Sequence, residues 1–259
     1  MINGPVWDES KLQEEGEFPT VLAIGDSWFW YPFNNLANPL YKILNRNRKH
    51  VMLVRGANGA EAIEYESGPI RSEIEWDLKK RGGYGNYIEA VFLSGGGNDL
   101  AGKDDFVKVI QQDCSGARTP ADCLRRGQPA RLFNTVQRAL LSVVDLVQKN
   151  IPGTPVFVHG YDYANPNGVG FLGLGQWLQY PMLQCGVPRR LHQPLVNLII
   201  DEFWNSLQRS QAQAPTLHLI DERGTLKRED WANELHPTIP AFNHVAKCWT
   251  PILKAQGVV

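Results

Sequence analysis

The sequence lacks any run of about 18 consecutive apolar residues, the length that a membrane-spanning helix needs, so no transmembrane segment is expected. Residues 1–19 carry early acidic side chains and no apolar stretch, and they therefore do not resemble a secretory signal. A signal that had been removed would leave the same pattern. The sequence thus leaves the compartment open between the cytoplasm and secretion by a route that is not visible in it.

Neither sign of charge dominates the chain. The 26 basic and 27 acidic residues give a formal net charge of −1, so no electrostatic attraction to nucleic acid or to an anionic membrane is predicted. A hydrophobic content of 43% is typical of a globular protein that buries a substantial core. Because the chain shows no internal repeat, low-complexity tract or linker, we expect one domain over residues 1–259.

Cysteine is scarce, and none of the four cysteines has C-x-x-C spacing, so a zinc site is not expected. Cys114 and Cys123 flank a short polar segment that contains a proline. In an oxidising compartment a disulfide could close this segment, and otherwise both residues are free thiols. The sequence does not decide between these two states.

Short apolar runs alternate with longer segments of helical period. The apolar runs are residues 20–24, 51–54, 90–94, 155–159 and 216–220, and the helical stripes cover 70–78, 131–150, 195–207 and 239–253. Strands that are apolar throughout are typical of a parallel sheet covered by helices on both faces, so we predict a doubly wound α/β domain. Two insertions, near residues 103–129 and 165–188, break the alternation. The second is rich in glycine and aromatic residues and is interpreted either as a cover over a binding cleft or as a surface insertion.

The residues that follow the predicted strands are the first place to look for a site, because ligands of open parallel sheets bind outside the carboxyl ends of the strands. The first strand runs directly into Gly25-Asp26-Ser27 and then into four aromatic residues. The other segments to inspect are residues 55–59, 95–99, 160–163 and, beyond the fifth strand, 233–237.

These segments contain the groups that acyl transfer by a serine requires. A hydroxyl such as that of Ser27 is a weak nucleophile and needs an adjacent base, most often a histidine such as His236. The oxyanion of the tetrahedral intermediate needs fixed donors, which backbone N–H groups at glycines and the amide of Asn98 could supply. Each residue alone would be read as structural, and their joint occurrence favours a catalytic site.

At these positions the chain resembles the SGNH (GDSL-type) hydrolases, a family with four signature blocks in a fixed order. Gly25-Asp26-Ser27 matches the first block, and Gly96-Gly97-Asn98-Asp99 matches the third. Gly59 is the better match to the glycine of the second block, with Gly56 as the competing choice, and His236 matches the fourth block.

The resemblance implies that Ser27 is the nucleophile and that His236 is the general base. It also implies an oxyanion hole formed by the Ser27 N–H, the Gly59 N–H and the Asn98 side chain. The implied fold is a flavodoxin-like three-layer α/β/α sandwich with a central parallel sheet of about five strands in the order 2-1-3-4-5. No metal or organic cofactor is implied.

The sequence departs from the family pattern three residues before His236, where Asn233 stands in place of the usual aspartate. An amide can accept a hydrogen bond from the imidazole but does not stabilise an imidazolium as a carboxylate does. Glu234 or Asp230 could supply the missing carboxylate, the site could work as a Ser–His dyad, or catalysis could be weak. All three readings remain open at this stage.

Three further residues are candidates for the substrate pocket. His159 ends the fourth strand and is a rival base, although a structural or substrate-contacting role fits it better. Trp28 and Tyr161 could line an apolar acyl pocket or a platform that stacks on a sugar.

We therefore predict a carboxylester hydrolase that acts on a small-molecule ester, with lipid, thioester and acylated-sugar substrates all open. The alternatives are a binding module with weakened catalysis and an acyltransferase that uses the same serine.

Overall fold

The computed structural model describes residues 2–31, 34–101, 103–170 and 177–259. Its centre is one parallel sheet with the strand order β2-β1-β3-β4-β5. The strands are β1 (Val21–Gly25), β2 (Met52–Gly56), β3 (Ala90–Leu93), β4 (Val156–His159) and β5 (Leu217–Ile220). The parallel five-stranded sheet and its strand order are thereby confirmed.

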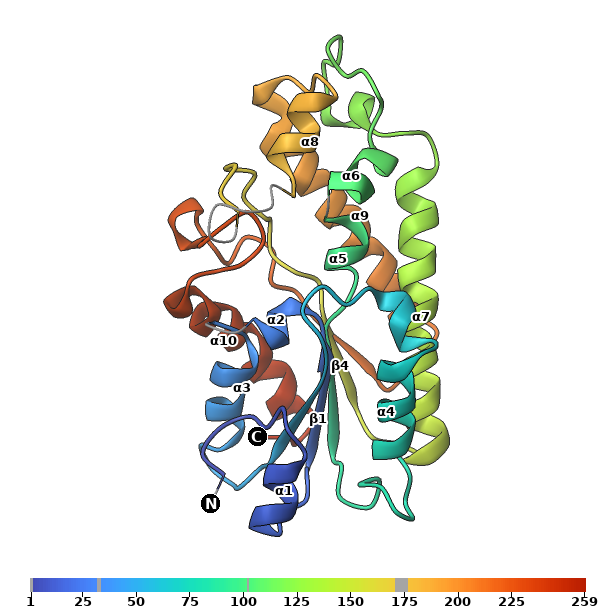
Figure 1. Cartoon of the computed structure of the whole chain (residues 1–259), viewed down its shortest axis with the longest axis vertical. Helices are drawn as coiled ribbons and strands as arrows, with labels where there is room; N and C mark the ends of the chain where they lie inside the picture. Colours follow the sequence, from blue (N-terminus) through green and yellow to red (C-terminus); the bar gives the residue numbers. More distant parts are fainter. Residues whose placement is uncertain (1, 32–33, 102, 171–176) are drawn as a thin grey trace.

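Helices cover both faces of the sheet (Figure 1). One face is covered by α3 (Ala37–Leu44) and α10 (Ile239–Ala255). The other is covered by α4 (Pro69–Asp77), α7 (Gln128–Asn150) and α9 (His192–Gln211). This arrangement is the α/β/α sandwich that the sequence predicts. The described helices include none long and apolar enough to cross a bilayer.

Short helices lie beyond the carboxyl ends of the strands, toward the upper part of Figure 1. They are α2 (Ser27–Trp30), α5 (Gly97–Leu100), α6 (Lys103–Val109) and α8 (Gln179–Gln184). The remaining elements are α1 (Ser10–Glu15) and the 3-10 turns η1 (Ala62–Tyr65), η2 (Pro120–Cys123), η3 (Arg189–Leu191) and η4 (Arg228–Asp230).

Hydrophobic burial accounts for the sandwich. All residues of β1 and β3 are buried, because both faces of these strands pack against helices. Helix α7 buries one apolar stripe, including Val136, Leu140 and Val143, and leaves its opposite face to solvent. Helix α10 begins where the Thr238 side chain accepts a hydrogen bond from the Ala241 N–H at 3.4 Å.

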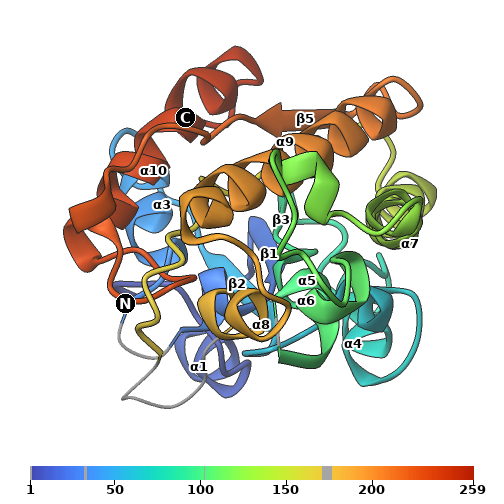
Figure 2. The same cartoon turned by 90° about the horizontal axis from the view of Figure 1, so that it is seen from above.

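The two insertions extend the upper part of the molecule in Figure 1, and the view from above in Figure 2 shows their helices α6 and α8 side by side. The first contributes α6 and η2, and its Cys114 and Cys123 are buried free thiols. The second contributes α8. The predicted cover falls partly on residues 171–176, which lie outside the described residues.

Candidate active site

Ser27 and His236 meet at the carboxyl edge of the sheet. Ser27 is the first residue of α2, directly after β1, and His236 lies in the loop before α10. The His236 Nε2 atom is 2.8 Å from the Ser27 Oγ atom, within hydrogen-bond distance. Two residues separated by most of the chain are thus in direct contact.

The turn at Ser27 is fixed by the residue before it. Asp26 is the N-cap of α2, and its carboxylate accepts the Trp28 N–H at 3.0 Å. The same carboxylate also accepts hydrogen bonds from the hydroxyls of Ser94, at 2.8 Å, and Tyr161. Since Asp26 is 1% exposed and fully engaged, it acts on the position of Ser27 through the backbone.

Asn233 lies on the other side of the imidazole. Its Oδ1 atom is 3.1 Å from the His236 Nδ1 atom. The same oxygen accepts the backbone N–H groups of Leu235 at 2.9 Å and of His236 at 2.8 Å, while the Asn233 Nδ2 faces the Tyr31 hydroxyl at 3.4 Å. Because the two backbone donors require an acceptor, the orientation of the amide group is determined.

This orientation determines the tautomer of His236. An oxygen that faces Nδ1 can only accept, so Nδ1 carries the proton and donates to Asn233. The Nε2 atom is then unprotonated and is the atom that accepts the Ser27 hydroxyl proton. Asn233 therefore selects the tautomer that a general base requires, even though it carries no charge.

Aromatic rings enclose the imidazole. The Tyr31 ring stacks on His236 with centroids 4.2 Å apart and an interplanar angle of 11°, and Trp177 packs edge-on at 6.1 Å. His236 is 5% exposed, and this burial lowers its pKa to about 4. The imidazole is accordingly neutral, and able to accept a proton, over the physiological pH range.

Glu234 and Asp230, the two carboxylates proposed as substitutes for the missing aspartate, have other partners in the structure. The fully buried Glu234 carboxylate accepts backbone N–H groups from Gly168, Trp177, Leu178 and Gln179 at 2.6–3.2 Å. Asp230 accepts the Lys227 N–H at 2.8 Å. Glu234 thus anchors two separate segments of the second insertion, at Gly168 and at residues 177–179, and holds Trp177 against His236.

Replacing Glu234 with glutamine is expected to lower the free energy of unfolding by about 2–4 kcal/mol, since the NH2 group of the amide would face two of the four backbone N–H groups that the carboxylate accepts. Thermal unfolding followed by circular dichroism measures the change. The matched control is E229Q, which alters an exposed glutamate in η4 and should change stability by less than about 0.5 kcal/mol. If E234Q kept the stability of the unaltered protein but lost ester hydrolysis, Glu234 would be the triad acid instead.

Asn98 and the loop after β2 are tied together beside Ser27. The Asn98 Nδ2 donates to the Ala60 carbonyl at 3.0 Å, and the Asp99 carboxylate accepts the Ala62 N–H at 2.9 Å. Gly59 lies in this loop with φ of +80°, and a Cβ there would meet no atom within 4 Å. Gly56, the competing choice, has a different role, because a Cβ at that residue would lie 1.9 Å from the Gly25 carbonyl oxygen.

His159 lies under the site, fully buried, between two strand ends. Its Nδ1 is 2.9 Å from the Glu222 carboxylate and its Nε2 is 2.8 Å from the Ser94 hydroxyl, which in turn donates to Asp26. Residues at the ends of β1, β3, β4 and β5 are thereby connected in one polar network. The sequence made His159 a candidate for the substrate pocket. In the structure it is 0% exposed and lies in the layer beneath the site, which we call the floor.

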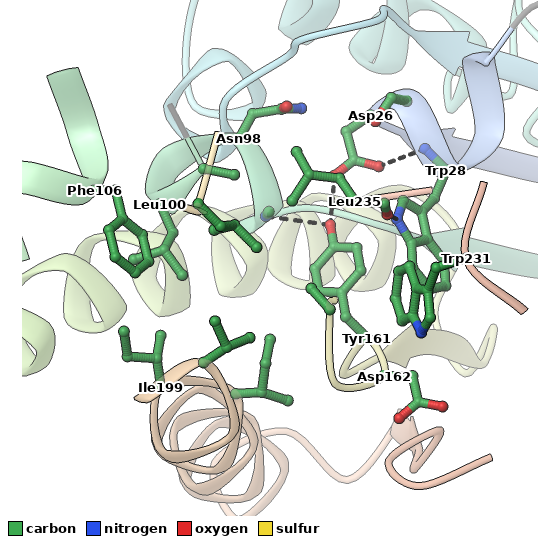
Figure 3. Close-up of a pocket in the computed structure, with 17 residues that line it drawn as sticks. Asp26, Trp28, Asn98, Leu100, Phe106, Tyr161, Asp162, Ile199, Trp231 and Leu235 are labelled. Atoms are coloured by element: carbon green, nitrogen blue, oxygen red, sulfur yellow. Dashed lines mark hydrogen bonds between the residues drawn. The ribbon is translucent and has the colours of Figure 1, made fainter. Parts of the chain in front are cut away.

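A cavity opens beside Ser27, and Figure 3 shows the side chains that line it. Trp28, Tyr161 and Asn98 are among them. The rest of its wall comes mainly from apolar side chains of α5, α6 and α9, from Leu178 of the second insertion, and from Trp231 and Leu235 in the segment before α10. Within the described residues, no group of three or more His, Cys, Asp or Glu side chains is arranged to hold a metal ion.

Comparison with solved structures relates this arrangement to known proteins. A GDSL-like lipase, so described, from Parabacteroides merdae superposes with a TM-score of 0.57 at 14% identity, over 93% of this chain and 98% of that one. The lipase Lip_vut3 from a goat rumen metagenome superposes with a TM-score of 0.56 at 15% sequence identity, over 93% of this chain and 98% of that one. The extracellular lipase of Streptomyces rimosus superposes with a TM-score of 0.55 at 15% sequence identity, over 92% of this chain and 99% of that one. No protein-family model and no curated protein sequence matches the chain.

The chain has the SGNH hydrolase fold. The residues that match the four signature blocks all follow strands or precede the last helix: Ser27 lies after β1, Gly59 after β2, Asn98 after β3 and His236 before α10. Their positions agree with the general rule for sites in open parallel sheets.

Several residues around Ser27 and His236 were not predicted as functional from the sequence. Tyr31 was one of four consecutive aromatic residues, and nothing marked it as the ring that stacks on His236. Trp177 belonged to the second insertion, whose role was open. Ser94 and Glu222 follow strands β3 and β5, so an inspection of polar residues at every strand end would have found them.

Proposed function

We propose that the protein is a serine hydrolase that cleaves carboxylic esters through a covalent acyl-serine intermediate. The observation that carries the proposal is the 2.8 Å contact between Ser27 Oγ and an imidazole nitrogen of His236 that Asn233 keeps unprotonated. The fold shared with lipases supports it.

In the acylation step, Ser27 Oγ attacks the ester carbonyl carbon while His236 Nε2 takes the hydroxyl proton. The tetrahedral intermediate collapses, the bond to the leaving alcohol breaks, and the imidazolium returns the proton to the alcohol oxygen. A water molecule then attacks the acyl-serine, His236 takes one of its protons and passes it to Ser27, and the carboxylic acid leaves.

The proposed oxyanion donors are the backbone N–H groups of Ser27 and Gly59 and the Asn98 amide. Among the described residues, neither of these N–H groups has a backbone acceptor, so both are available to a substrate oxygen. The Asn98 amide donates one of its two N–H groups to the Ala60 carbonyl, and the other N–H group is available to a substrate. Asn98 and Ser27 line the same cavity, which supports their joint action on one carbonyl group.

We assign Asn233 as the residue that orients His236, so the site works as a Ser–His dyad with an amide partner. The neutral amide gives the imidazolium less stabilisation than a carboxylate would. Burial of His236 also disfavours the charged imidazole and so lowers the pKa of the base further. The dyad is therefore a correctly oriented but weak base.

Labelling by a fluorophosphonate tests the proposal, because the probe phosphonylates activated serines. We expect one adduct per chain, located on Ser27 by peptide mass spectrometry, and no adduct in S27A. An unlabelled protein would favour the binding module over the enzyme. If acyl groups are released mainly onto added alcohols or sugars instead of water, the protein is an acyltransferase.

A further inference from the structure

The cavity beside Ser27 differs in polarity from one end to the other. Its walls include the apolar side chains Leu100, Phe106, Leu178, Val196, Ile199 and Ile200. The nucleophile Ser27 and the amide of Asn98 also line it. In Figure 3, Phe106 and Ile199 lie at the side of the cavity away from Asp26 and Trp28, which flank the nucleophile in sequence.

Most polar groups that reach the cavity wall are already paired. The Asp162 carboxylate accepts the backbone N–H groups of Tyr163, Gly224 and Leu226, all at 2.6 Å. The hydroxyl of Tyr161 donates to Asp26 and accepts the Gly97 N–H at 3.3 Å.

The indole N–H of Trp28, another wall residue, donates to the Leu235 carbonyl at 3.2 Å. Among the described polar side chains of the wall, hydrogen-bonding capacity is left at Ser27, at Asn98 and at the indole N–H of Trp231, which lies on the same side of the cavity as Trp28 in Figure 3.

This distribution discriminates between the two kinds of occupant that an aromatic-rich pocket could hold. A sugar ring placed inside would leave its hydroxyl groups without partners, at a cost of about 1–3 kcal/mol for each buried group. A hydrocarbon chain needs no partners and gains free energy from burial.

We propose that this cavity binds the acyl chain of the ester, and that the substrates are esters of straight-chain fatty acids of short to medium length. The proposal rests on the proposed function, since Ser27 must be the atom that is acylated.

The size of the cavity sets the expected chain length. The centres of water-sized spheres can occupy about 60 Å³ of it. Each water-sized sphere extends about 1.4 Å beyond its centre, so the space that an occupant fills is larger than this figure. The cavity still holds only several groups of the size of a water molecule or a methylene. An acyl chain of short to medium length would therefore fill it.

The test compares 4-nitrophenyl esters from acetate to dodecanoate, because the leaving group stays constant while the acyl chain grows. Each buried methylene is worth roughly fourfold in kcat/KM. We expect kcat/KM to rise by at least about tenfold from acetate to an optimum near butyrate to hexanoate, and to fall for longer chains.

Variants of Ile199 test whether this cavity is the cause. I199F shortens the cavity and should lower the ratio of hexanoate to acetate kcat/KM by about tenfold or more. I199A lengthens it and should move the optimum to longer chains. The matched control is I74A, which removes the same atoms from a buried isoleucine of α4 outside the cavity and should leave the ratio unchanged.

The outcomes separate this inference from the proposed function. If esters are hydrolysed by Ser27 but acetate is the best substrate, or if the Ile199 variants change all esters by one common factor, the acyl-cavity inference is wrong and the serine hydrolase stands. If no ester of any length is hydrolysed and the fluorophosphonate does not label Ser27, the proposed function is wrong and the inference fails with it.

Discussion

Replacing Ser27 with alanine is expected to lower kcat/KM for 4-nitrophenyl butyrate by roughly 10⁴- to 10⁶-fold, the range seen when a catalytic serine is removed. The substitution deletes the atom that forms the acyl bond, while His236 and the oxyanion donors stay in place. The residual rate should come from water activated in the same pocket. Steady-state kinetics at saturating and subsaturating ester measure the effect.

The fold should not be affected by this substitution. Ser27 is the first residue of α2, and the cap of that helix comes from Asp26. The matched control is S72A, which alters an exposed serine of α4 and should keep full activity. Undiminished turnover in a folded S27A protein would refute Ser27 as the nucleophile.

Replacing Asn233 with alanine is expected to lower kcat by about 10²- to 10⁴-fold with little change in KM, because the amide touches the base and not the substrate. Without the Oδ1 atom, no other described residue accepts a hydrogen bond from Nδ1 and selects the tautomer with a free Nε2. N243A is the matched control, since Asn243 is exposed on α10. Activity close to that of the unaltered protein in N233A would show that another group orients His236.

The dependence of activity on pH is a second, independent test of the role of Asn233. His236 must be neutral to accept a proton, and burial lowers its pKa to about 4. Activity should therefore be retained as pH falls below the ordinary histidine value of 6.5 and should be lost only near pH 4. In N233D a carboxylate next to Nδ1 favours the imidazolium and raises the pKa, so the acid limb should move to higher pH. An acid limb that does not move in N233D would contradict this assignment.

The sequence predicted the sheet and the strand ends well because both depend on local patterns. Continuous apolar runs identified β1 to β5, and the parallel sheet brings the residues after them to one edge. The contact between Ser27 and His236 is long-range, yet the fold rule and the family resemblance together were enough to anticipate it.

The role of Glu234 could not be predicted from the sequence. Its partners, Gly168 and residues 177–179, are remote in the chain, and no periodicity links them to residue 234. The orientation of the Asn233 amide was equally inaccessible, because it depends on two backbone N–H groups in a loop without regular structure. Pairings of this kind depend on the three-dimensional path of loops, which carry no repeating pattern.

The network of Asp26, Ser94, His159 and Glu222 also constrains how the molecule can change over evolutionary time. A single replacement would strand a donor or acceptor in a dry interior, which is more damaging than exchanging the whole set for hydrocarbon side chains. Divergence at these four positions should therefore be concerted. The apolar cavity residues Phe106 and Ile199 make no hydrogen bond to these four side chains, so new substrate preferences can arise there while the floor beneath the nucleophile is inherited intact.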